Sequence, residues 1–292
     1  MEWTRPPANR SLEERASADQ SAIEAALQDR TLADGSVLRL LDAGSGEAMV
    51  FVPMIAELNF VYAPQLEEFG RDHRVLVYEP RLSRTSHYGI ADRAREIILL
   101  LDALSIERAH LVAWSDAGSA AYHFAKTWPD RCRSVVFLGL ADEYRFPQPL
   151  HLATRLLAAV PLEWFVPNRV LARILARYLG GRKVKSQWVA QRAARVPHLA
   201  RLFKHSVLPN LLEHQPSAGE VGVPSVVLCG DDDALVSIAQ AQRMARLLAG
   251  AGEAVIIPGG EHFLGYVHPD SVNSAMRTFY QKASGGAMGL EA

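Results

Sequence analysis

Cysteine is scarce in this sequence, and long apolar runs are missing from it. The 292 residues include two cysteines, Cys132 and Cys229. Cys229 falls in an apolar segment typical of a core strand, so a disulfide framework is not expected. The longest apolar runs, such as residues 97–101, are far too short to span a bilayer, and the N-terminus has no apolar signal core. We therefore expect a cytoplasmic protein without a transmembrane segment.

Clusters of metal-ligating residues are also missing. No group of His, Cys and Asp residues has the spacing of a metal site, and the run of residues 231–233 lacks the glycine and distal glutamate of a calcium loop. His268, directly before Pro269, is expected to open the last helix instead. No basic motif has a recognised nucleic-acid readout geometry. We expect no metal, no cofactor and no nucleic-acid partner.

Apolar segments and amphipathic segments alternate along the chain. With 49% hydrophobic and 22% charged residues, the composition is typical of a globular protein with a large core. Such alternation predicts an α/β fold with a mostly parallel sheet and helices on both faces. The expected strands are residues 48–52, 74–78, 109–112, 134–140, 224–230 and 253–258, and the expected helices are residues 91–104, 119–127, 238–248 and 271–280.

Ser115 lies between an apolar strand and a helix rich in small residues. Residues 113–117 read Ala-Trp-Ser-Asp-Ala, which matches the nucleophile elbow G-x-S-x-G except that both glycines are alanine. Alanine is the smallest replacement, so the sharp turn remains feasible. The simpler alternative is that Ser115 caps the helix that follows.

An acid and a histidine each follow a later strand. Asp233 comes after residues 224–230, and His262 comes after residues 253–258. Side chains at the carboxyl ends of parallel strands gather at one edge of the sheet. There, an imidazole activates a serine hydroxyl, and a carboxylate holds the imidazole in the correct tautomer. The alternatives are a solvated acidic turn and a loop histidine, and Asp231, Asp232 and Asp142 are rival acids.

In these motifs and in their chain order, the sequence resembles the α/β-hydrolase superfamily over roughly residues 31–283. The resemblance implies an α/β-hydrolase fold with a helical cap. It also implies that Ser115 is the nucleophile, that His262 is the general base and then acid, and that Asp233 orients the imidazole. The backbone N–H groups of Ile55 and Asp116 would form the oxyanion hole.

The loops around this site depart from the family pattern. Pro53-Met54 stands where relatives have His-Gly, and Leu82 and Arg84 replace two glycines of another loop. The same change from glycine to a bulkier residue in the elbow suggests a reshaped pocket. Glu57 lies close in sequence to Ile55; it either points to solvent or acts as an acid or base in non-hydrolytic chemistry.

The organisation along the chain follows from these elements. We expect residues 31–143 and 221–283 to form the core domain, residues 144–220 a helical cap, residues 1–30 an N-terminal extension and residues 284–292 a flexible tail. Residues 11–14 have the spacing of a capping box, so the extension should contain a helix. The extension is either an arm across the domain, a dimer contact or a frayed tail.

The expected cap is strongly basic. Residues 144–219 contain twelve Lys and Arg but only two acids, Glu163 and Glu213, whereas the whole chain has a net charge of −1. A basic surface beside a pocket attracts anions. Candidate partners are a small-molecule substrate, an acyl-carrier protein, a coenzyme A thioester or an anionic membrane surface; the alternative is pairing with the acidic core. Homo-oligomerisation is left open. Aromatic residues either line a substrate pocket or form ordinary core: Trp164, Phe165, Tyr178, Trp188 and Phe203.

The combined features predict an enzyme, a serine esterase that hydrolyses an ester, lactone or thioester of a small, moderately hydrophobic substrate through an acyl-enzyme. Acyl transfer would use the same machinery. Two further hypotheses are a cofactor-free lyase, cyclase or isomerase and a non-catalytic ligand-binding homologue, because one fold hosts many functions.

Overall fold

The computed structural model describes residues 3–6, 11–54, 56–80, 88–143, 166–196, 199–208, 214–248 and 252–287. Within these ranges the chain forms one eight-stranded sheet in the order β1-β2-β4-β3-β5-β6-β7-β8. The strands from β3 and β4 to β8 pair in parallel, and β1 and β2 add an antiparallel edge. The predicted α/β class and mostly parallel sheet are confirmed.

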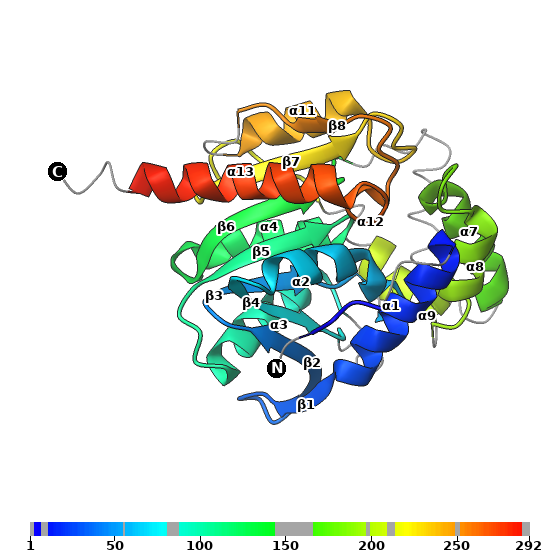
Figure 1. Ribbon diagram of the computed structural model, residues 1–292, viewed down its shortest axis with the longest axis horizontal. Coiled ribbons are helices and arrows are strands. Elements are labelled where there is room, and N and C mark those ends of the chain that lie inside the picture. The colour runs from blue at the N-terminus through cyan, green and yellow to red at the C-terminus, as the bar shows by residue number, and fades with distance from the viewer. Residues whose placement is uncertain are drawn as a thin grey trace.

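The strands alternate with helices as Figure 1 shows. The strands are β1 Gln28–Thr31, β2 Val37–Gly44, β3 Glu47–Val52, β4 His73–Tyr78, β5 Ala109–Trp114, β6 Cys132–Leu138, β7 Ser225–Gly230 and β8 Val255–Ile257. The helices are α1 Leu12–Ala26, η1 Ala56–Tyr62, α2 Ala63–Phe69, α3 Ile90–Ala103, α4 Ala117–Thr127, η2 Pro129–Arg131, α7 Asn168–Leu179, α8 Ser186–Ala193, α9 Leu199–Leu202, η3 Phe203–Val207, α11 Ile238–Leu247, α12 Leu264–Val267 and α13 Pro269–Ala287.

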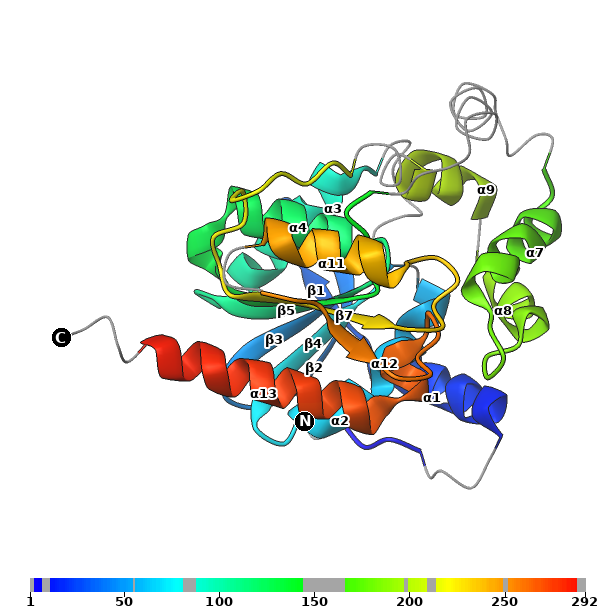
Figure 2. The same cartoon turned by 90° about the horizontal axis from the view of Figure 1, so that it is seen from above.

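Two apolar cores lie on the two faces of the sheet. Helices α3, α4 and α11 cover one face, and α1, α2, α12 and α13 cover the other (Figure 2). Successive strand residues point to opposite faces, so Met49 and Phe51 of β3 join one core while Val50 and Val52 join the other. Because β5 and β7 are buried along their whole length, their sequences are nearly continuous apolar runs.

Helix α1 begins with the predicted capping box. The backbone N–H of Ser11 donates to the Glu14 carboxylate, and the N–H of Glu14 donates to the Ser11 hydroxyl. The helix packs across the domain instead of fraying: its Asp19 accepts hydrogen bonds from Arg5 and from Tyr266 of α12. The Gln20 side chain accepts from the backbone N–H of Phe60 in η1.

The last helix differs from its prediction. Helix α13 begins at Pro269, directly after His268, and continues to Ala287, whereas the sequence suggested a tail from residue 284. Adding a residue to an existing helix costs far less than starting one, so the helix continues through two glycines of poor propensity. Residues 288–292 lie outside the described ranges.

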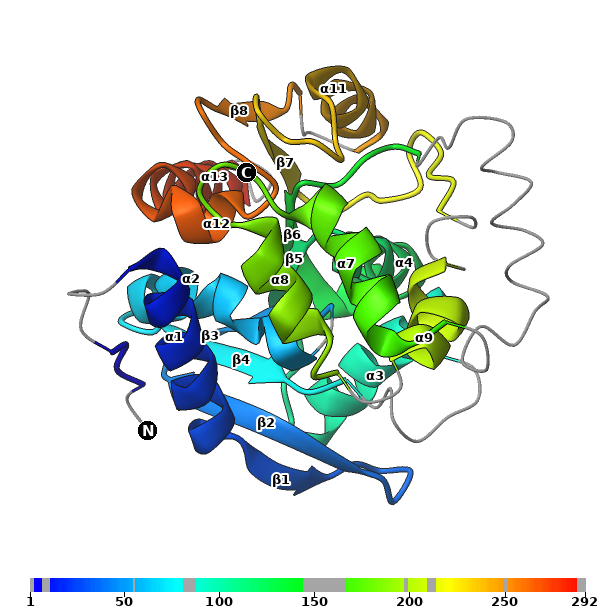
Figure 3. The same cartoon turned by 90° about the vertical axis from the view of Figure 1, so that its right-hand side faces the viewer.

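The segment between β6 and β7, residues 144–220, is called the insertion below. Its described helices α7, α8 and α9 lie at one end of the sheet, which Figure 3 views from that end. Several of their apolar side chains, including Leu171 and Val189, belong to the same core as α1 and η1. The insertion is therefore packed onto the domain through an apolar contact.

Candidate active site

Ser115 occupies a strained turn between β5 and α4. Its φ angle is +56°, a left-handed conformation that costs a non-glycine residue about 1–2 kcal/mol. The Ser115 N–H donates to the Leu138 carbonyl at 2.9 Å, and the Gly118 N–H donates to the Ser115 carbonyl at 2.9 Å. The replacements Ala113 and Ala117 are fully buried. The chain thus makes a sharp strand-to-helix turn with alanine at both usual glycine positions.

Gly118 is the glycine that this turn keeps. A Cβ there would lie 2.9 Å from a methyl carbon of Leu140, closer than real Cβ atoms come to a neighbour. The residue therefore lets α4 approach the segment that follows β6.

His262 lies between Ser115 and Asp233. Its Nε2 is 2.8 Å from the Ser115 Oγ, and its Nδ1 is 2.9 Å from an Asp233 carboxylate oxygen. The exposed fractions of the His262 and Asp233 side chains are 2% and 0%. The structure therefore brings together the three residues that the sequence indicated, in a chain of hydrogen bonds shielded from water.

The Asp233 carboxylate is held by more than the histidine. Its other oxygen accepts the backbone N–H groups of Leu235 and Val236 at 2.8 and 3.0 Å. Burial alone would raise the pKa of Asp233, but the His262 charge, the His262 hydrogen bond and these two N–H groups together lower it. The carboxylate therefore stays ionised beside the imidazole.

The rival acids have other partners. Asp231 accepts the Gly259 N–H at 2.6 Å, and Asp142 forms an ion pair with Arg243 at 2.6 Å. Asp232 pairs with Arg182 of the insertion. Among these four aspartates, Asp233 is the one that contacts His262.

The residues proposed for the oxyanion hole are only partly described. Ile55, the Glu57 side chain and the loop with Leu82 and Arg84 lie outside the described part of the chain. Asp116 lies at the N-terminus of α4, one residue after Ser115, as an oxyanion donor requires. Its buried carboxylate accepts a hydrogen bond from Arg93 of α3 at 2.8 Å.

Sequence reasoning missed three residues that support this site. Arg93, within the amphipathic pattern of α3, also donates to the Pro53 carbonyl at 3.0 Å. Trp114 donates from its indole N–H to the His262 carbonyl at 2.7 Å. Glu261 is only 4% exposed although it is charged. Its place between Gly260 and His262 in the histidine loop is the signal that could have identified it.

Of the aromatic residues of the insertion, Trp188 and Phe203 are described. The Trp188 ring contacts Phe60 edge to face at 5.1 Å between centroids, and Phe203 packs against the same core. Trp188 thus joins the insertion to the domain beside Phe263, which stacks on Phe60 at 5.9 Å. Trp164, Phe165 and the Tyr178 side chain lie outside the described part.

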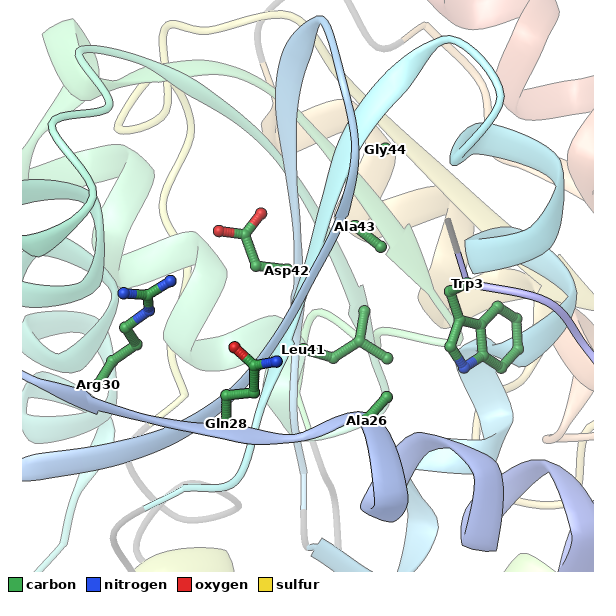
Figure 4. Close-up of a pocket in the computed structure, with 8 residues that line it drawn as sticks. All are labelled: Trp3, Ala26, Gln28, Arg30, Leu41, Asp42, Ala43 and Gly44. Atoms are coloured by element: carbon green, nitrogen blue, oxygen red, sulfur yellow. The ribbon is translucent and has the colours of Figure 1, made fainter. Parts of the chain in front are cut away.

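A separate cavity of about 270 Å³ lies beside β1 and β2 (Figure 4). It is formed by eight residues, none of which belongs to the Ser115, His262 and Asp233 group: Trp3, Ala26, Gln28, Arg30, Leu41, Asp42, Ala43 and Gly44. We locate the chemistry at the hydrogen-bonded trio, because this cavity offers no nucleophile or base.

Two searches cover the described residues only. No group of three or more His, Cys, Asp and Glu side chains there could hold a metal ion. No helix in those same ranges is long and apolar enough to cross a membrane.

Comparison with known proteins agrees with this architecture. A curated relative, 2-hydroxy-6-oxo-6-phenylhexa-2,4-dienoate hydrolase of Burkholderia cepacia, is 24% identical over 267 residues, which are 81% of this chain and 88% of the relative. The structure of a thermophilic esterase from Thermogutta terrifontis superposes with a TM-score of 0.74 at 19% identity, over 88% of this chain and 98% of the esterase.

The enol-lactonase from Burkholderia xenovorans LB400 gives a TM-score of 0.72 at 18% identity, over 87% of this chain and all of the lactonase. At these identities the two structural likenesses show the fold. The sequence model described as the alpha/beta hydrolase family matches residues 37–275. The chain therefore belongs to the alpha/beta hydrolase family, whose matched members are enzymes named for hydrolysis.

Proposed function

We propose that this chain is a serine-dependent hydrolase of a carboxylic ester, lactone or thioester, acting through an acyl-enzyme on Ser115. The observation that carries the proposal is the hydrogen-bonded series from Ser115 through His262 to Asp233, at 2.8 and 2.9 Å, on a turn with positive φ. The relatives named as hydrolases support the reaction class.

In the first half-reaction, the Ser115 Oγ attacks the carbonyl carbon while its proton moves to the His262 Nε2. The charge on the resulting oxyanion is stabilised by backbone N–H groups, for which Asp116 and Ile55 are the proposed donors. Asp233, which accepts from Nδ1, stabilises the imidazolium. The imidazolium then gives its proton to the leaving oxygen or sulfur, and the carbon bond to that atom breaks.

In the second half-reaction, water replaces the leaving group. His262 takes a proton from the water as its oxygen attacks the acyl carbon, and the returned proton restores the Ser115 hydroxyl as the acid leaves. An alcohol, amine or thiol in place of water gives acyl transfer with the same proton movements. The products are thus set by which nucleophile reaches the acyl-enzyme.

We further propose that the insertion is a cap that favours anionic, moderately hydrophobic substrates. Its described residues 166–196 and 199–208 contain ten Lys and Arg and no Asp or Glu. Arg169, Arg173 and Arg177 are all exposed on α7, at the spacing that aligns side chains on one helix face. Such a surface raises the local concentration of an anionic ester, a coenzyme A thioester or an acyl-carrier protein.

The test is labelling with a fluorophosphonate, followed by intact mass and by hydrolysis of short and medium acyl nitrophenyl esters. Wild type should gain one label and turn over the esters, and Ser115→Ala should do neither. The matched control is Ser105→Ala, because Ser105 also has a positive φ, of 53°, and is exposed. If folded wild type takes up no label, the acyl-enzyme is wrong and proton-transfer chemistry or ligand binding replaces it.

A further inference from the structure

The insertion contacts the histidine loop directly, through the loop between α7 and α8. The Glu261 carboxylate accepts the backbone N–H of Arg182 at 2.7 Å and the backbone N–H of Lys183 at 3.1 Å. Glu261 is the residue directly before His262, and it is 4% exposed. A buried carboxylate thus caps two amide groups of the insertion and adjoins the proposed general base.

Gly181 is shaped to this contact. A Cβ on Gly181 would lie 2.4 Å from a Glu261 carboxylate oxygen and 2.5 Å from its carboxyl carbon, a distance that real Cβ atoms do not reach. The backbone of the insertion therefore approaches the carboxylate as closely as glycine alone permits. Any side chain at this position would push the two loops apart.

Two surface contacts accompany the buried one. The Arg182 guanidinium pairs with Asp232, next to Asp233, and the Lys183 Nζ lies 3.0 Å from the Nε2 of His268. The exposed fractions of the Arg182 and Asp232 side chains are 77% and 47%, and such exposed pairs contribute roughly 0–1 kcal/mol. Hydrogen bonds to a charged group that is shielded from water are stronger, so Glu261 should dominate the contact.

We propose that Glu261 is a positioning residue that couples the insertion to His262, so that the place of the α7–α8 loop sets the geometry of the catalytic histidine. This inference rests on the proposed function of the trio. When the loop is seated, the peptide of residues 261 and 262 is held from both sides: the Glu261 side chain is held by the insertion, and the His262 carbonyl is held by the Trp114 indole. When the loop moves away, Glu261 loses its partners and the imidazole loses one of these restraints.

The sharpest test is a double-mutant cycle between Glu261→Ala and Gly181→Ala. Each single change should slow acylation of Ser115 by about 10–100-fold with KM nearly unchanged, since a displacement of about 1 Å of a catalytic group has effects of this size. Because Glu261→Ala removes the atoms that the new Cβ would meet, the double variant should match Glu261→Ala within about twofold. Additive losses, or two single variants with wild-type rates, would overturn the proposal.

Matched controls separate this effect from general damage. Gly222→Ala adds a Cβ where no atom lies within 4 Å, and Glu253→Ala removes an exposed carboxylate; both should keep the wild-type rate. Glu261→Gln keeps one carbonyl oxygen as acceptor, so it should recover part of the acylation rate, which a requirement for bulk alone at this position does not predict for kcat over KM.

Hydrogen–deuterium exchange of the peptide that contains Arg182 and Lys183 distinguishes the two levels of the proposal. In Glu261→Ala these amides should exchange faster than in wild type. Unchanged exchange would sink the coupling while leaving the hydrolase standing. Faster exchange in a protein whose wild type never takes up a fluorophosphonate would sink the hydrolase while the contact between loop and carboxylate stands.

Discussion

The Arg93 guanidinium donates to the Asp116 carboxylate over 2.8 Å, and the two side chains are only 2% and 4% exposed. Burial would lower the pKa of Arg93, but the neighbouring Asp116 carboxylate and its hydrogen bond raise it, so the pair is ionised. Arg93 also donates to the Pro53 carbonyl at the end of β3. One cation therefore joins the elbow to the strand whose following loop is proposed to complete the oxyanion hole.

Replacing one member of this pair should be costly. Arg93→Met leaves the Asp116 charge buried without its partner, which lowers the free energy of unfolding by about 3–5 kcal/mol. The double variant Arg93→Met with Asp116→Asn leaves no charge and should lose much less than the sum of the single variants. Urea unfolding of the four proteins measures this. Strict additivity would mean that the pair contributes nothing as a pair.

The choice among the aspartates has a direct kinetic test. Asp233→Asn keeps the shape of the side chain but removes the charge that stabilises the imidazolium, so kcat should fall by about 10³–10⁴-fold. The control is Asp142→Asn, because Asp142 pairs with Arg243 and does not contact His262; its kcat should stay within about twofold of wild type. The reverse ranking would assign the acid to Asp142.

Salt should reveal the role of the α7 arginines. If the basic face attracts anionic substrates, kcat/KM for an ester that carries a free carboxylate should fall as ionic strength rises, while a neutral ester of the same length is unaffected. The triple variant Arg169→Gln, Arg173→Gln, Arg177→Gln should lose several-fold in kcat/KM for the anionic ester at low salt and little for the neutral one. Equal losses for both esters would show that the arginines stabilise the insertion instead.

His214 should make the fold sensitive to mild acid. It is 4% exposed, its Nε2 lies 3.1 Å from the Ala141 carbonyl, and burial lowers its pKa to about 4 from an ordinary 6.5. Between these two pH values the unfolded chain binds a proton that the folded chain does not bind. The stability is therefore complete above pH 6.5 and falls as the pH drops toward 4, with a loss of about 2 kcal/mol at pH 5.

The variant His214→Gln, which keeps a side-chain N–H for the Ala141 carbonyl, should lack this loss. Urea unfolding of both proteins at pH 7.5, 6 and 5 gives the comparison. The gap between wild type and variant should shift by about 2 kcal/mol in favour of the variant from pH 7.5 to pH 5. A constant gap would show that another group controls the acid sensitivity.

Much of the fold could be predicted because parallel strands buried on both faces are written as apolar runs. The edge hairpin could not: β1 is polar and exposed at every position, so it carries no periodic signal and is a strand only because it pairs with β2. The resemblance to the α/β hydrolases covered the trio for a different reason. Its residues follow strands directly, and a strand end is visible in the sequence.

The supporting residues were beyond the sequence because their partners are far away in it. Arg93 lies in a helix whose pattern resembles any amphipathic helix, and its burial depends on Asp116 and on Pro53, 40 residues earlier. Glu261 has an acidic side chain in a loop, which usually lies in water. Its partners are backbone groups of the insertion, and backbone donors leave no trace in residue identity.

The bond between Asp19 and Tyr266 links the two ends of the domain across 247 positions of chain. During synthesis, α1 therefore emerges long before its partner in α12 exists. Until then the Asp19 carboxylate and the apolar face around Ile23 have no complete surface to pack against. Docking of α1 should be among the last steps of folding, and a nascent chain stopped before residue 266 is a natural target for chaperones.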